Sequence, residues 1–152
     1  MKEIRRILWP TDFSDQAARA VPWVNGMAHR FAARVDLVHV LSPTLALASM
    51  TGHAAATTTA YLDEMKSHAT ENLEAIARDD IADGVERTTT VLTGSAAREI
   101  ARFADEEKID LIILATHGET GLMRLVTGSV AERVVRLAPC PVLSVPPSPP
   151  DE

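Results

Sequence analysis

The sequence predicts an α/β domain with a doubly wound parallel sheet of five strands and helices on both faces. Short apolar segments alternate along the chain with segments of helical periodicity, and parallel strands require such helical crossovers. The continuous apolar run Leu111–Ala115 is typical of a strand buried on both faces. The length of 152 residues suits a single domain, which we expect over residues 1–146.

The first strand and the first helix are bounded by residues that suit those positions. Apolar residues from Ile4 lead to Pro10, where proline removes a ladder donor and the strand must stop. Ser14 is a good helix N-cap, and apolar residues then recur at three- and four-residue spacing to about Ala33. Pro22 lies inside this span, so the helix either kinks there or starts later than Ser14 indicates.

The middle of the chain predicts two strands on either side of an acidic helix. Residues 35–41 form the second strand, and residues 42–60 include a stretch without a clear period whose role the sequence does not indicate. A helix begins near Thr58 and is closed by Gly84, with its acidic residues on a solvated face. Residues 85–92, with three consecutive threonines, form a β-branched third strand.

The last third of the chain predicts two helices and two strands. Ser95 caps a helix that leads into the fourth strand, residues 110–115. A loop rich in glycine and threonine precedes a helix that starts at Ser129, and the fifth strand runs from Pro141 to Val145. We expect the proline-rich tail, residues 147–152, to be disordered.

Composition and charge exclude several classes of protein. Hydrophobic residues make up 46% and charged residues 24%, which excludes a disordered, collagen-like or coiled-coil chain. The net charge of −6 argues against sequence-independent binding of nucleic acid. Apolar runs are too short for a bilayer and residues 1–8 lack a signal-peptide core, so we expect a cytoplasmic protein without membrane contact. Cys140 is the only cysteine, which excludes an intrachain disulfide.

Two loops that follow strands carry residues suited to a ligand, because ligands of open parallel sheets bind where the strand order reverses. After the first strand, the segment 10–14 provides a carboxylate and two hydroxyls. After the fourth strand, three of the seven glycines fall between positions 118 and 128. If Asp12 and Gly118 serve one ligand, the first and fourth strands are neighbours, and the strand order is 3-2-1-4-5.

The glycine-rich loop has the features of a phosphate site. Glycine permits positive φ and close backbone approach, so the N–H groups of the loop can converge on an anion. Gly128 and Ser129 open a helix whose first N–H groups lack internal partners, and the helix dipole adds positive charge there. Ser129 and Glu132 also form a capping box, and the glycines also suit a long turn, so these alternatives stay open.

Four segments of the chain resemble the universal stress protein family. They are Ile-Leu-Trp-Pro-Thr-Asp-Phe-Ser (7–14), Asp-Leu-Ile-Ile-Leu-Ala-Thr-His-Gly-Glu-Thr-Gly-Leu (110–122), Gly-Ser-Val-Ala-Glu-Arg-Val (128–134) and Ala-Pro-Cys-Pro-Val-Leu (138–143). The segments occur in the family's order across nearly the whole domain. The resemblance implies an adenine nucleotide alpha hydrolase-like fold with strand order 3-2-1-4-5, and a regulatory role in stress response.

The resemblance also implies an ATP site, with two departures from the family pattern. ATP-binding members carry Gly, two residues, Gly, nine residues, then Gly followed by Ser or Thr, and Gly118 and Gly128 match its second and third glycines. The first position is Ala115, which adds a methyl group close to the nucleotide. Glu119 stands where many relatives have Arg or Lys, and its carboxylate repels a triphosphate unless it turns to solvent or a cation lies between them.

Individual nucleotide contacts follow from the same resemblance. The Asp12 carboxylate would accept hydrogen bonds from the ribose hydroxyls, and Pro10 and Val40 would wall the adenine, although each also suits an ordinary structural role at a strand or helix end. The remaining residues of the implied site are Thr11, Ala115, Gly118, Gly121, Gly128, Ser129 and the N–H of Val130. The expected ligand is ATP, with Mg²⁺ bridging its phosphate oxygens and no metal site formed by protein ligands alone.

Three functions compete at this point. A regulatory domain that binds ATP is favoured, a nucleotide-free interaction protein of the stress response comes second, and an ATP-using enzyme ranks last. We assign no catalytic residue and expect at most a very slow ATPase, since Arg124 is the only cation of the phosphate loops and His117 fits a turn better than a base. We also expect a homodimer through the exposed edge strand from Pro141 to Val145.

Overall fold

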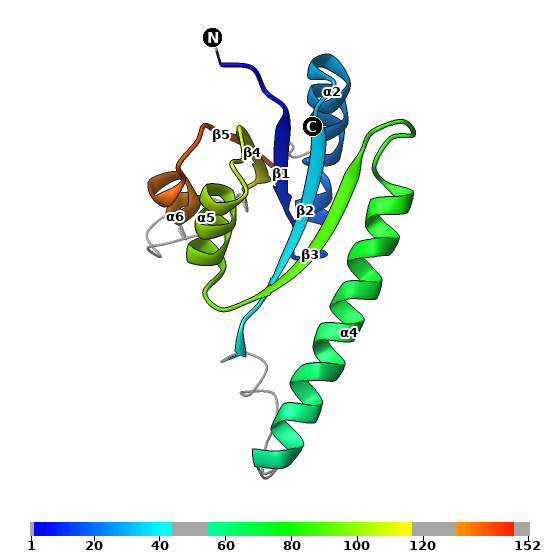
Figure 1. The fold of residues 1–152 in the computed structure, drawn as a ribbon, viewed down its shortest axis with the longest axis vertical. Helices are drawn as coiled ribbons and strands as arrows, with labels where there is room; N and C mark the ends of the chain where they lie inside the picture. The colour runs from blue at the N-terminus through cyan, green and yellow to red at the C-terminus, as the bar shows by residue number, and fades with distance from the viewer. Residues whose placement is uncertain (1, 44–54, 117–129, 148–152) are drawn as a thin grey trace, which may run out of the picture.

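A parallel sheet of five strands organises the part of the chain that this computed structural model describes, residues 2–43, 55–116 and 130–147 (Figure 1). The strands are β1 (Arg6–Pro10), β2 (Arg34–Leu41), β3 (Arg87–Thr93), β4 (Leu111–Ala115) and β5 (Val142–Val145). They are arranged in the order β3-β2-β1-β4-β5, and every pairing is parallel. The predicted fold class and strand order are therefore confirmed.

Helices cover both faces of this sheet, with α2 and α4 on one face and α5 and α6 on the other (Figure 1). The helices are α1 (Asp15–Ala18), α2 (Val21–Phe31), α4 (Ala55–Asp79), α5 (Ala96–Glu106) and α6 (Val130–Leu137). Most predicted boundaries differ from the observed ones by a few residues, because the end of an element depends on bonds to its neighbours. Residues 148–152 of the proline-rich tail lie outside the described residues.

One alternative about the helices is decided and one prediction needs correction. The amphipathic helix after β1 starts later than Ser14 indicates, because α2 begins at Val21, and Pro22 lies in its first turn, where its missing N–H leaves no helical bond unmade. Ser14 caps only the short α1, with its Oγ accepting a hydrogen bond from the Ala17 N–H at 3.1 Å. Gly84 does not close the long helix, since α4 ends at Asp79. Its φ of 83° instead serves the turn into β3.

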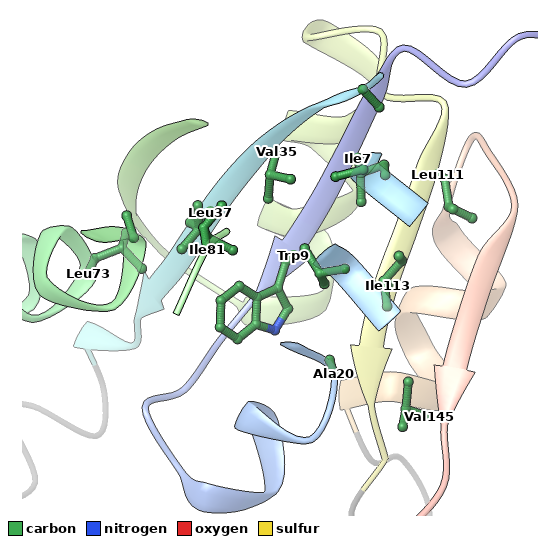
Figure 2. Packing of buried hydrophobic residues seen from close by; sticks show 14 residues of the cluster. Ile7, Trp9, Ala20, Val35, Leu37, Leu73, Ile81, Leu111, Ile113 and Val145 are labelled. Atoms are coloured by element: carbon green, nitrogen blue, oxygen red, sulfur yellow. The ribbon is translucent and has the colours of Figure 1, made fainter. Parts of the chain in front are cut away.

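Alternating residues of the strands fill two apolar cores, one on each face of the sheet. Figure 2 shows the core under α2 and α4, where Ile7, Trp9 and Ile113 are at most 1% exposed. On the opposite face, Leu8 and Ile112 are fully buried beneath α5 and α6. Because β1 and β4 are covered on both faces, their carboxyl ends are held at fixed positions.

A buried carboxylate joins the amino ends of three strands. Asp36 of β2 is 1% exposed and accepts hydrogen bonds from Arg6 Nη2 of β1 at 3.0 Å, from Arg34 Nη2 at 2.9 Å and from Thr88 Oγ1 of β3 at 2.7 Å. Burial opposes the ionisation of Asp36, but the bonds from Arg6, Thr88 and Arg34 outweigh it and lower its pKa. Arg6 also donates to the backbone carbonyl of Glu107, just after α5.

We predict that Asp36→Asn lowers the free energy of unfolding by about 2–3 kcal/mol, because two guanidinium groups lose their buried anion. A lowered pKa adds stability above the unfolded-state pKa of about 4. That stability is lost as the pH falls through the folded-state value. The difference between wild type and variant should therefore shrink between about pH 5 and pH 2 in urea titrations.

The control for this experiment is Glu3→Gln, which removes the partner of Arg5 in an exposed ion pair. This variant should leave the unfolding midpoint unchanged, since exposed pairs contribute little. A loss of stability in Asp36→Asn that stays constant across the pH range would contradict the ionised, hydrogen-bonded state of Asp36.

Candidate functional site

A pocket of about 180 Å³ opens at the carboxyl ends of β1, β2 and β4. The structure brings six of the predicted site residues together in its lining: Pro10, Thr11, Asp12, Val40, Ala115 and Val130. The other four, Gly118, Gly121, Gly128 and Ser129, lie outside the described residues. The pocket is at the centre of the sheet, where the strand order reverses at β1, which is the usual ligand position in open α/β sheets.

The floor of the pocket is apolar and belongs to the α5 and α6 face of the sheet. Val38, Ile100 and Leu114 line it, and all three are members of the core on that face. Such a surface suits a flat, weakly polar ring, with specificity left to a few polar groups at the rim.

The backbone of Val40 supplies two polar groups at this rim. The β1–β2 ladder ends with the bond from the Thr11 N–H to the Val38 carbonyl at 2.9 Å, whereas the Leu41 carbonyl accepts a bond from Gly94 on the β3 side. Backbone groups of successive residues point to opposite sides of a strand, so those of Val38 and Val40 point to the same side. The N–H and C=O of Val40 therefore point past the end of β1, as one donor and one acceptor side by side.

The Asp12 carboxylate is held at the rim by the loop between β1 and α1. Its Oδ1 accepts hydrogen bonds from the N–H and the hydroxyl of Ser14, and Ser14 Oγ in turn accepts from the Ala17 N–H. Thr11 Oγ1 accepts a bond from the Phe13 N–H at 3.1 Å. Asp12 therefore orients the residue that caps α1 and does not cap the helix itself.

Two helix N-termini also face the pocket, since Ala96 of α5 and Val130 and Ala131 of α6 line it. The first N–H groups of a helix lack intrahelical acceptors, and the helix dipole places partial positive charge there. This side of the pocket favours an anionic group, whereas the Val40 side favours a neutral one with a donor and an acceptor.

Two polar residues near the site were missed by sequence reasoning. His39 lines the pocket, and its Nδ1 lies 2.8 Å from the Thr11 carbonyl oxygen. Arg19 Nη2 donates to the Thr116 carbonyl at 3.4 Å, which places a cation beside the end of β4. The available signal was the polar His39 in an otherwise apolar strand end, whereas no local pattern joins Arg19 to Thr116.

Other candidate chemistry is limited in the part of the chain that the structure describes. It contains no cluster of three metal-ligating side chains and no helix long and apolar enough to cross a membrane. His117, Glu119 and Arg124 fall in residues 117–129, outside the described segments. Cys140 is half-buried between α6 and β5, and burial raises the pKa of its thiol, as expected for a packing residue.

Comparison with known proteins identifies the family of the chain. A model of the Universal stress protein family matches residues 3–146. Universal stress protein MJ0531 of Methanocaldococcus jannaschii is 36% identical over 142 residues, which cover 93% of this chain and 81% of the relative. The chain belongs to the universal stress protein family.

Solved structures of similar proteins agree with this assignment. The structure of protein MJ0577 from the same organism superposes on this universal stress protein with a TM-score of 0.81 at 27% identity, covering 97% of this chain and 99% of the other. A universal stress protein solved in complex with cAMP has the same fold, with a TM-score of 0.64 at 21% identity, covering 97% of this chain and 100% of that one.

Proposed function

We propose that this universal stress protein binds ATP in the pocket at the ends of β1, β2 and β4, and acts as a regulatory domain in the stress response. The observation that carries the proposal is the convergence in one pocket of the Asp12 carboxylate, the Val40 backbone groups and the N-termini of α5 and α6. Sequence positions about 120 residues apart are needed to build this arrangement.

The nucleoside half of ATP fits the groups on the β1 and β2 side. The edge of adenine offers a ring-nitrogen acceptor beside an amino donor, which is complementary to the N–H and C=O of Val40. The apolar floor of Val38, Ile100 and Leu114 would contact the face of the base. The Asp12 carboxylate would accept hydrogen bonds from the ribose hydroxyls.

The phosphates would extend toward the N-termini of α5 and α6, where the helix dipoles favour negative charge. In this proposal Gly118, Gly121, Gly128 and Ser129 complete the phosphate site, and Mg²⁺ bridges the phosphate oxygens. The methyl group of Ala115 adds a contact at the wall of the pocket. The cAMP complex of a protein with the same fold supports an adenine nucleotide as the ligand class.

Binding of ATP is tested by calorimetry on the purified protein. Asp12→Asn should weaken binding about tenfold, or about 1.4 kcal/mol, because a charged acceptor for the ribose hydroxyls becomes neutral. Asp15→Asn, three residues away on α1, should bind as tightly as wild type because Asp15 does not line the pocket. The absence of binding heat from the wild type at millimolar ATP would refute the nucleotide proposal.

Hydrolysis of the bound ATP is expected to be slower than about one turnover per second. Fast hydrolysis requires a positioned base and a cation beside the γ-phosphate, and Glu119 is the candidate base without a basic partner at a matched spacing. Single-turnover phosphate release from wild type and Glu119→Ala measures this. Turnover faster than one per second that depends on Glu119 would make the protein an ATPase.

We also propose that two copies pair through β5, the edge strand next to β4. The carbonyls of Pro141 and Val145 accept bonds from the β4 side. Because successive residues of a strand point to opposite sides, Ser144, directly before Val145, points its N–H to the free edge. Thr116, just past β4, donates its N–H to the Val145 carbonyl at 2.9 Å. The nucleotide site and the dimer edge are thereby joined, which suits a regulatory role.

Light scattering at tens of micromolar protein should give twice the 16.4 kDa mass of the chain. Ser144→Pro removes a backbone donor from the free edge without breaking the pairing of β5 with β4, and should shift the mass toward the monomer. Thr89→Pro, which removes an outward donor from the opposite edge strand β3, is the control and should remain dimeric. A monomeric wild type would exclude the dimer.

A further inference from the structure

The loop that carries Asp12 is fastened to β2 at two consecutive residues. The Thr11 N–H donates to the Val38 carbonyl at 2.9 Å, and the Thr11 carbonyl lies 2.8 Å from Nδ1 of His39. A carbonyl oxygen only accepts, so Nδ1 carries the hydrogen and donates. Both polar backbone groups of Thr11 are therefore bound to β2 at the point where β1 has ended.

His39 also holds the residue on the other side of Asp12. The Phe13 and His39 rings are stacked, with centroids 4.2 Å apart and planes 27° from parallel. Phe13 has a φ of 67°, in the left-handed region that residues with a side chain rarely adopt. The stack, together with the packing of Phe13 against the core that contains Trp9, offsets that strain.

Asp12 thus lies between two residues that the same imidazole ring holds in place. We propose that His39 is a positioning residue for nucleotide binding, which fixes Thr11 and Phe13 so that the Asp12 carboxylate stays where the ribose hydroxyls bind. This inference rests on the proposed binding of ATP. It assigns to His39 an effect on ATP affinity that acts through Asp12, at the hydrogen bonds between its carboxylate and the ribose hydroxyls.

Substitutions can separate the two contributions of the imidazole. His39→Asn places an amide N–H close to the position of Nδ1 and removes the ring. His39→Phe keeps a ring to stack on Phe13 and removes the donor. His39→Gln carries its amide one bond further out, near the position of Nε2, so it is a polar variant of similar size that lacks the donor at Nδ1.

The experiment compares the affinities for ATP and for 2′,3′-dideoxy-ATP by calorimetry. Wild type should prefer ATP about tenfold, because only ATP offers hydroxyls to Asp12. His39→Phe and His39→Gln should lose most of this preference, by weakened binding of ATP with little change for the dideoxy analogue. His39→Asn, which keeps the donor to Thr11 and loses the stack on Phe13, should lose less of the preference than His39→Phe or His39→Gln. His29→Phe, on the exposed surface of α2, is the matched control and should keep the full preference.

A double-variant cycle checks that His39 acts through Asp12. In an Asp12→Ala background, His39→Gln should cause no further loss of ATP affinity, because the group that His39 positions is already absent. Additive losses would show that His39 contributes independently of Asp12 and would overturn the proposal. Thermal unfolding of each variant identifies any that fails to fold. If His39→Phe fails to fold, the comparison of His39→Asn with His39→Gln still tests the proposal.

The outcomes separate this proposal from the proposed function. A wild type that binds ATP and prefers it, with the same preference in His39→Gln, contradicts the positioning role alone. Equal losses for ATP and the dideoxy analogue indicate a general effect on the fold and overturn the role as well. A wild type that binds neither compound contradicts the proposed function, and the positioning role falls with it.

Discussion

The central position of β1 is the constraint on which the rest of this structure depends. Ile7, Leu8 and Trp9 are all buried, so β1 needs a parallel neighbour on each edge and helices over both faces. The chain meets this need by building β2 and β3 on one side of β1, then crossing to build β4 and β5 on the other. Because the two sets of connections diverge at β1, the carboxyl ends of β1 and β4 are left open to form the pocket.

The two ends of the sheet use acidic side chains in opposite ways. At the amino ends, Asp36 is buried and its hydrogen-bonding capacity is taken by Arg6, Arg34 and Thr88. At the carboxyl ends, Asp12 is exposed in a loop beside an apolar pocket. The first arrangement contributes stability to three strands, whereas the second leaves a carboxylate where a ligand can reach it. The buried carboxylate and the exposed one therefore lie at opposite ends of the same sheet.

The polar groups described at the pocket are already fixed in place by the fold. The Val40 backbone and the N-termini of α5 and α6 are fixed dipoles that form part of the secondary structure, so they need no rearrangement to meet a ligand. Arg19, which lies beside the end of β4, donates a hydrogen bond to the Thr116 carbonyl. Thr116 in turn donates its N–H to the Val145 carbonyl, so the end of β4 at the pocket is hydrogen-bonded to the edge strand β5.

The sequence by itself determined the fold class, because alternating strand and helix periods, Pro10 after β1 and the apolar run of β4 are local patterns. Through its motifs it also indicated the loops at which a site should form, including Asp12 and Val130. Only the tertiary structure decided that Pro22 lies in the first turn of a separate helix α2, that Asp36 joins three strands and that His39 holds the Asp12 loop. These features depend on residues brought together by strand pairing, and neither spacing nor periodicity encodes which side chain of one strand meets which backbone group of the next.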